Sequence, residues 1–139
     1  MTALLDQLFD LWLEPVDQRE DPEAAFRRLY ADPVSVNGAP MPVTSLVERA
    51  RSLQRSFTGL QIEIVDQVVT PDRIAVAFYM RGRHVGELLT PIGTVAATGH
   101  PVEIRTIDVL TIADDVITAL WVLSDELGTL NQLDVVQLV

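Results

Sequence analysis

The sequence contains no cysteine, which excludes disulfide bonds, thiolate metal sites and cysteine nucleophiles. It is also poor in positive charge, with 10 Lys and Arg residues against 20 Asp and Glu residues and a formal net charge of −10. Binding to nucleic acid or to an anionic membrane surface requires clustered basic side chains. We therefore expect neither nucleic acid nor a membrane as a partner.

Long apolar runs are missing as well. No run approaches the roughly 20 residues that a helix needs to cross a bilayer, and residues 1–6 lack the basic and apolar regions of a signal peptide. We therefore expect a cytoplasmic protein. The two histidines show no HxH or HExxH spacing, and the glycines match neither a phosphate-binding loop nor a dinucleotide fingerprint. The sequence thus predicts no metal and no organic cofactor.

Apolar residues are frequent enough to form the core of one domain. The 139 residues are 48% hydrophobic, and no linker or repeat divides them, so we expect a single domain over residues 1–139. In the first half, apolar residues recur at spacings of three and four, which is typical of amphipathic helices. The predicted helices run from Leu4 to Trp12, from Asp21 to about Tyr30, and from about Ser45 to Phe57. Asp21 and Ser45 are the expected N-caps of the second and third helices.

Between the second and third helices, residues 32–42 are expected to be mostly loop, with a short strand over 34–36. From residue 60 onward the apolar period changes to two, which indicates strands. The predicted strands are 60–69, 74–89 with a bend near Gly82 or Gly86, 102–112, and 116–125. Three helices followed by antiparallel strands predict an α+β fold, in which a curved sheet and its helices form a cone around an apolar cavity.

The turn between the last two strands decides which of their side chains share a face. If Asp114 and Asp115 are the two central turn residues, counting outward places Asp108 opposite Trp121. The same count puts Asp125 on that face. A slip of one residue would move one strand's set of side chains to the other side of the sheet.

The predicted face holds two carboxylates among apolar side chains, with Thr106 beside them. Desolvation raises the pKa of a carboxyl group, which suits proton transfer near neutral pH. Two simpler roles remain open. Asp125 could cap the helix that begins near Glu126, and Asp108 could form an ion pair with Arg105.

The second strand adds a histidine to this interior. Phe78, Met80 and His84 share one parity along it, so they are expected to face the aspartates. His84 could equally be a hydrogen-bonded core residue. His100 lies in a loop and is expected to be exposed.

Five segments, in this order, resemble motifs of the SnoaL-like polyketide and ester cyclases, a branch of the nuclear transport factor 2-like superfamily. The run Gly82–Leu88 resembles the family's GxHxGxL stretch, and Pro91–His100 its following glycine loop. The other three are the strand–turn–strand segment Asp108–Ile117, the WxxxD motif at Trp121–Asp125 and the closing LxQL at Leu130–Leu133. The resemblance covers roughly residues 22–134, with departures at Ala97, Asp115 and Asp134.

The resemblance implies a cone with a deep apolar cavity, a homodimer, and cofactor-free aldol ring closure in which an aspartate is the general acid and base. Asp125 matches that aspartate, His84 and Trp121 match pocket positions, and Asn37 is the candidate from the loop after the second helix. The expected catalytic residues are Asp125, His84 and Asp108. The expected substrate-binding residues are Trp121, Asn37, Met80, Phe78 and Thr106.

The function expected from the sequence is therefore a cyclase- or isomerase-type enzyme that performs acid–base chemistry on an apolar small molecule. An epoxide hydrolase of the same fold is one alternative, because it needs two carboxylates and a cation, and Asp108, Asp125 and Arg105 are present. However, Arg105 has the opposite parity on its strand. A noncatalytic, dimeric module that binds a small ligand is the other alternative.

Overall fold

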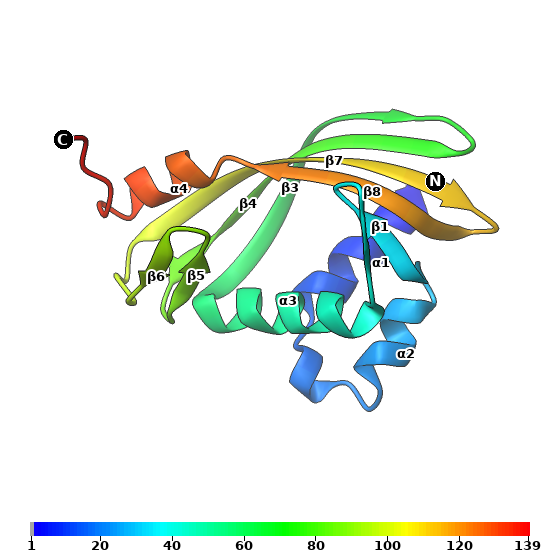
Figure 1. The fold of residues 1–139 in the computed structure, drawn as a ribbon, viewed down its shortest axis with the longest axis horizontal. Helices are drawn as coiled ribbons and strands as arrows, with labels where there is room; N and C mark the ends of the chain where they lie inside the picture. Colours follow the sequence, from blue (N-terminus) through cyan, green and yellow to red (C-terminus); the bar gives the residue numbers. More distant parts are fainter. Residues whose placement is uncertain (1) are drawn as a thin grey trace.

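The chain folds into four α-helices and eight strands within residues 2–139, as a computed structural model shows (Figure 1). The helices are α1 (Thr2–Leu13), α2 (Pro22–Arg27), α3 (Val43–Ser56) and α4 (Glu126–Gln132), with a short 3-10 helix at Val16–Gln18. The strands are β1 (Tyr30–Val36), β2 (Ala39–Met41), β3 (Phe57–Val69), β4 (Arg73–His84), β5 (Leu88–Thr90), β6 (Gly93–Val95), β7 (Pro101–Ala113) and β8 (Val116–Ser124). No helix within residues 2–139 is long and apolar enough to cross a membrane.

Six of the strands form one curved sheet in the order β2-β1-β8-β7-β4-β3. The β1–β8 pair is parallel and the other neighbours are antiparallel, so the sheet is mixed. Figure 1 shows α1, α2 and α3 on one side of this sheet, and the small β5–β6 hairpin beside one end of α3. The predicted α+β architecture with a curved sheet is confirmed. The predicted order differs in one respect, since β1 and β2 of the sheet precede α3 along the chain.

The main core lies between the concave face of the sheet and the helices. Alternate residues of each strand point into it, because successive side chains of a strand face opposite sides. Burying one such side chain contributes roughly 1.5–3 kcal/mol. The buried residues include Leu5, Leu8 and Leu11 from α1, Val43, Leu46 and Ala50 from α3, and Ile74, Val76, Leu110 and Ile117 from the sheet.

Tyr30 begins β1, so its predicted place in the second helix is wrong. Helix α2 ends at Arg27, and the carbonyl oxygen of Leu29 already accepts a hydrogen bond from the backbone N–H of Ile117 in β8 (2.7 Å). Pro33 also disfavours helix, because the residue before a proline is pushed toward extended backbone. Long-range pairing thus decides the conformation here, and the sequence window alone does not contain it.

The two predicted helix caps differ in outcome. Asp21 caps α2 as predicted, with its carboxylate accepting a hydrogen bond from the Ala24 N–H (3.0 Å). Ser45 does not cap α3, which begins two residues earlier at Val43. The N–H group of Val43, the first residue of α3, donates instead to the Asp32 carboxylate from β1 (3.0 Å). A side chain distant in sequence therefore performs the capping that a local pattern suggested.

Two segments of the sequence analysis differ from the prediction in extent, one being more ordered and the other shorter. Residues 32–42 form the β1–β2 hairpin, whose turn is Asn37-Gly38 with φ of 51° and 86°, the left-handed pair that favours Asn-Gly. The strand predicted over 74–89 ends at His84. Beyond it, the N–H groups of Val85 and Gly86 donate to the carbonyl oxygen of Ser56, and a Cβ at Gly86 would collide with the Arg55 carbonyl.

Candidate functional site

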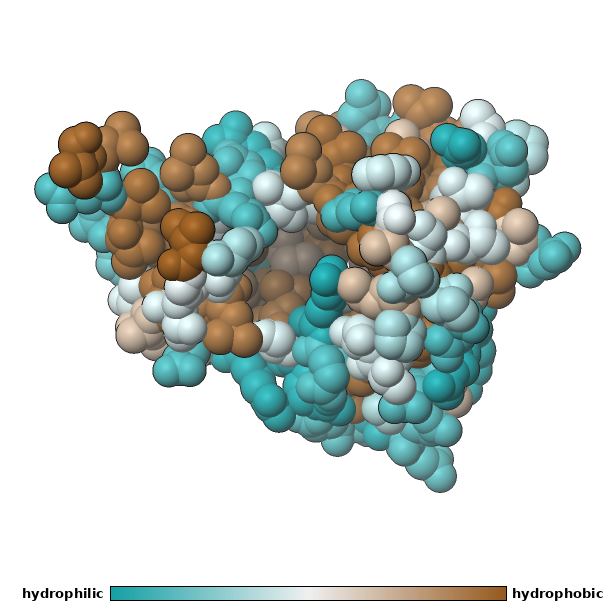
Figure 2. Space-filling model, in the orientation of Figure 1, coloured by the Kyte–Doolittle hydropathy of each residue, from teal (hydrophilic) through white to brown (hydrophobic). Residues whose placement is uncertain are grey.

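A cavity of about 350 Å³ lies between the concave face of the sheet and the helices. Figure 2 shows its opening as a hollow near the middle of the face, with apolar atoms in its depth. Most of the side chains around it are apolar, among them Leu8, Phe9, Trp12, Leu46, Phe57, Ile62, Phe78, Met80, Ile104, Leu120 and Val122. The polar ones are Tyr30, Arg49, Thr106, Asp108, Ser124, Glu126 and Thr129, with Thr90 from β5.

The register of β7 and β8 differs from the prediction by one residue. The turn at Asp114-Asp115 pairs Ala113 with Val116 as expected, but the register shifts after Ile112. Asp108 therefore lies opposite Val122 and not opposite Trp121. An extra residue in one strand is a β-bulge, which turns the following side chains to the other face. Here the extra residue is Thr118.

As a result, Asp125 does not face the cavity, and its predicted position is wrong. It stands at the N-cap of α4, where its carboxylate accepts a hydrogen bond from the Gly128 N–H (2.9 Å). A Cβ at position 128 would meet this carboxylate, so any other residue there would push the capping side chain out of place. The side chain is 43% exposed, and Arg105 approaches it at 3.8 Å on the outer face of the sheet. The simpler alternative, a helix cap, describes Asp125.

Trp121 is also misplaced by the prediction. After the bulge it points away from the cavity, is 60% exposed, and packs next to Gly38. Asn37 does not line the cavity either. Its amide nitrogen donates to the carbonyl oxygen of Val122 (3.2 Å), and its amide oxygen accepts from the Val122 N–H (2.8 Å). Asn37 thus holds β8 in place near the bulge and has no contact with the interior space.

His84 is buried but is a hydrogen-bonded core residue. Its Nδ1 accepts a hydrogen bond from the Thr98 N–H (3.1 Å) and lies 2.9 Å from the Thr98 hydroxyl, while its ring packs on Phe57. Its other ring nitrogen, Nε2, is buried with no partner in residues 2–139. His84 does not line the cavity, and it anchors the loop before β7.

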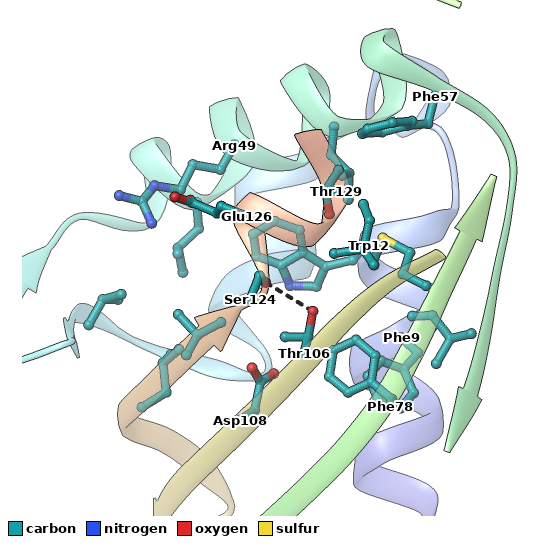
Figure 3. Close-up of a pocket in the computed structure, with 18 of the residues that line it drawn as sticks. Phe9, Trp12, Arg49, Phe57, Phe78, Thr106, Asp108, Ser124, Glu126 and Thr129 are labelled. Atoms are coloured by element: carbon teal, nitrogen blue, oxygen red, sulfur yellow. Dashed lines mark hydrogen bonds between the residues drawn. The ribbon is translucent and has the colours of Figure 1, made fainter. Parts of the chain in front are cut away.

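The structure brings four of the predicted residues to the cavity wall: Phe78 and Met80 from β4, and Thr106 and Asp108 from β7. Strict alternation holds along both strands, since Phe78 pairs with Thr106 and Val76 with Asp108. The Thr106 hydroxyl lies 2.9 Å from the hydroxyl of Ser124, its direct neighbour on β8. Figure 3 shows this pair on the sheet wall near Asp108, with Phe78 beside Thr106.

Asp108 is the carboxylate most affected by the cavity. Its burial raises the pKa of the carboxyl group from 3.8 to about 7, because desolvation penalises the charged form. Its oxygen Oδ1 is buried and meets no hydrogen-bond donor within the described chain. Such an isolated carboxyl group is costly for stability, and it is poised to gain and lose a proton near neutral pH.

Several cavity residues were missed by the sequence analysis. Phe9 and Trp12 come from α1, and Trp12 was recognised only as part of the apolar helix face. Arg49 on α3 and Glu126 at the start of α4 also line the cavity and are labelled in Figure 3. Ser124 was assigned to the outer face of the sheet, but the bulge turns its side chain toward the cavity. No signal in the sequence marks the bulge at Thr118.

The polar side chains around the cavity do not form a typical metal-binding group. Among residues 2–139 there is no group of three His, Cys, Asp or Glu side chains that could hold a metal ion.

Solved structures with the same fold span nearly the whole chain. TsrD from Streptomyces laurentii has a TM-score of 0.75 at 20% identity and covers 98% of each chain. IdmH from Streptomyces antibioticus, described as a proposed polyketide cyclase, has a TM-score of 0.75 at 21% identity, covering 96% of this chain and 97% of its own. AclR from Streptomyces galilaeus, described as a proposed hydroxylase, has a TM-score of 0.73 at 18% identity and covers 99% of each chain.

These likenesses confirm the predicted fold of a curved sheet covered by helices. No curated protein is a significant match to the sequence. The model of one protein family, the SnoaL-like polyketide cyclases, matches residues 7–133. This match spans nearly all of the cavity-forming elements, from α1 to α4. The chain therefore belongs to the SnoaL-like polyketide cyclase family.

Proposed function

We propose that this protein is a cofactor-free acid–base enzyme of the cyclase or isomerase type, and that Asp108 is its proton-transferring group. The single observation that carries the proposal is a carboxyl group with no hydrogen-bond donor at Oδ1, on the wall of an otherwise mostly apolar cavity. The family match supports a polyketide-like small molecule as the substrate.

The position of Asp108 suits removal of a proton from carbon. A general base is most effective when its pKa lies near the working pH, and burial raises the pKa of this carboxyl group to about 7. Phe78 and Met80 would contact the carbon skeleton, and the Thr106–Ser124 hydroxyl pair would accept or donate hydrogen bonds beside it. Closely packed walls hold the reacting groups together, which contributes to rate by orientation.

The test uses 2-tetralone, an apolar bicyclic ketone with acidic C–H groups. In D2O, the protein is expected to speed the exchange of these hydrogens for deuterium, followed by mass spectrometry. Asp108→Asn keeps the shape and removes the base, so exchange should fall by about 10²–10⁴-fold. Asp125→Asn is the matched control and should leave the exchange rate within about twofold of the unsubstituted protein.

Binding is measured in the same samples. The chain has two tryptophans, so Trp121→Phe leaves Trp12 in the cavity wall as the only tryptophan, and quenching of its emission by 2-tetralone reports occupancy. Binding without exchange would mean a noncatalytic ligand-binding module and contradict the enzymatic proposal. Loss of exchange in Asp125→Asn but not in Asp108→Asn would also contradict it. Absence of binding would contradict the ligand site itself.

The epoxide hydrolase alternative loses its support from the residues that motivated it. Asp108 faces the cavity, whereas Asp125 and Arg105 lie together on the outer face of the sheet. Two carboxylates and a cation around one water are therefore not assembled from these three side chains.

We also propose that two copies associate through the outer face of the sheet. Ile107 and Leu123 lie directly opposite each other on β7 and β8 and are 54% and 77% exposed, and Val109 and Trp121 are the next opposed pair. A contiguous apolar patch of this kind is typical of an interface. Leu123→Glu should convert a dimer to a monomer in sedimentation velocity, with unchanged 2-tetralone binding. A monomeric unsubstituted protein would contradict this proposal.

A further inference from the structure

A tyrosine at the start of β1 reaches the same cavity as Asp108. Tyr30 is 4% exposed, and its hydroxyl oxygen accepts a hydrogen bond from the indole N–H of Trp12 on α1 (2.9 Å). Both side chains line the cavity. Phe26 fixes the two rings from behind, stacking on Tyr30 with centroids 6.1 Å apart and meeting Trp12 edge-on at 5.8 Å. The Tyr30 side chain is thus held by contacts from two helices, α1 and α2.

The hydrogen-bond partners of this hydroxyl are incomplete. A tyrosine hydroxyl can donate one hydrogen bond and accept others, whereas an indole N–H can only donate. The bond to Trp12 therefore uses the oxygen of Tyr30 as an acceptor and leaves its hydrogen without a partner. No acceptor for that hydrogen lies within hydrogen-bond distance among residues 2–139. Leaving a buried donor unpaired costs about 1–3 kcal/mol, so the hydrogen is available to whatever fills the cavity.

The surroundings keep Tyr30 protonated. Burial raises the pKa of its hydroxyl well above the ordinary value, and the nearby charge of Asp108 raises it further. Tyr30 is therefore a hydrogen-bond donor over the whole range in which Asp108 titrates, and it does not act as a base. The two side chains have complementary roles: one accepts a proton and the other donates a hydrogen bond.

We propose that Tyr30, oriented by Trp12, donates its hydrogen bond to a carbonyl oxygen of the substrate, so that the cavity selects carbonyl compounds with an acidic C–H at Asp108. This inference rests on the proposed acid–base function and assigns the hydrogen-bond donor for it. It adds a second catalytic residue that no motif in the sequence marks.

The chemical step balances without a further reactant. The Asp108 carboxylate takes a proton from the carbon next to the carbonyl, and the electrons of that C–H bond form a C=C double bond. The electron pair of the carbonyl double bond moves to oxygen, which becomes an enolate oxygen and accepts the Tyr30 hydrogen bond. A donor aimed at charge that develops in the transition state typically contributes 10²–10³-fold to rate. Return of the proton to carbon, or to the alkoxide after aldol attack, restores Asp108.

The test compares two ligands that differ only at the carbonyl. 2-Tetralone and tetralin share one bicyclic skeleton, and tetralin has no oxygen. In the Trp121→Phe background, Tyr30→Phe should weaken 2-tetralone binding about 2–10-fold and leave tetralin binding unchanged. Deuterium exchange of 2-tetralone should fall about 10²-fold. Its pH midpoint should stay where Asp108 sets it, because the substitution leaves the base unchanged.

The matched control is the chain's other tyrosine. Tyr79 lies on the outer face of β4, with the Arg81 guanidinium 5.1 Å from its ring centre, and Tyr79→Phe should change neither binding nor exchange. Equal loss of both ligands in Tyr30→Phe would show a structural role and overturn the inference. Exchange lost in Asp108→Asn but intact in Tyr30→Phe would overturn it while the proposed function stands. Exchange intact in Asp108→Asn would remove the proposed function itself.

Discussion

The concave and outer faces of the β7–β8 hairpin place the same chemical group in opposite environments. Asp108 sits on the inner face, where burial raises its pKa to about 7 and Oδ1 has no donor. Asp125, one residue beyond β8, is on the outer side, half-exposed, bonded to a helix N-terminus and near Arg105. The comparison teaches that a carboxylate gains reactivity where the fold leaves it unsupported, and gives stability where the fold pairs it.

The largest expected contrast is in the pH dependence of exchange. Only the ionised form of Asp108 can accept a proton, so the rate with 2-tetralone should rise about tenfold per pH unit below 7 and level off above it. Between pH 5 and 8 the increase should be about 100-fold. Asp125→Asn should show the same profile. A midpoint near pH 4 would mean that Asp108 is solvated and would remove the contrast between the two faces.

The second contrast is in folding stability against pH. Because burial raises the pKa of Asp108 from 3.8 to about 7, the folded state keeps a proton that the unfolded state releases between about pH 4 and 7. Stability from this group is therefore full below pH 4 and is lost as pH rises through 7. Relative to the unsubstituted protein, Asp108→Asn should gain roughly 2–4 kcal/mol between pH 4 and 8. Urea unfolding of both proteins at pH 4 and pH 8 measures their free energies of unfolding. A stability difference between the two proteins that is the same at both pH values would contradict the prediction.

A smaller effect is expected at the residue that braces β8. Asn37→Ala removes two hydrogen bonds to the Val122 backbone and places alanine at a φ of 51°, so the free energy of unfolding should fall by about 1–2 kcal/mol. Asn37→Gly tolerates the backbone angle and isolates the hydrogen-bond contribution. Thermal unfolding gives the stabilities. A loss of 2-tetralone affinity without a loss of stability would return Asn37 to the substrate-binding role.

The smallest effect is expected at the helix cap. Asp125→Ala should lower the free energy of unfolding by about 1 kcal/mol, and Asp125→Asn by only a few tenths, because asparagine caps helices as well as aspartate. Urea unfolding of the three proteins at pH 8 tests the order. If both variants were equally destabilised, the charge of Asp125 and not its capping bond would be the important contribution.

Local rules predicted those parts of the molecule that depend on neighbouring residues. The Asp21 cap follows from its sequence context, and the alternation along β4 and β7 placed Phe78, Met80, Thr106 and Asp108 at the cavity. The family resemblance is confirmed by the match over residues 7–133. Strands and caps of this kind need only the few residues around them.

The failures share a different cause. Tyr30 was assigned to a helix because its pairing with Ile117, 87 positions later, is invisible in a local window. Trp121 and Asp125 were assigned to the interior because the turn was extended outward with strict pairing, and Thr118 breaks that pairing. The register of β8 is altered where β1 pairs with it, and Asn37 hydrogen-bonds to the backbone of Val122 there. These features depend on strand neighbours, and a single sequence does not reveal them.

The extra residue at Thr118 decides which face of the sheet each later side chain of β8 points to. Adding or deleting one residue at that point would exchange the whole inward set, Leu120, Val122 and Ser124, for the outward set in one event. A new lining and a new exterior would then arise together, with no substitution elsewhere. A functional role can therefore be assigned from motif spacing in a relative only for residues that precede such a bulge on the strand.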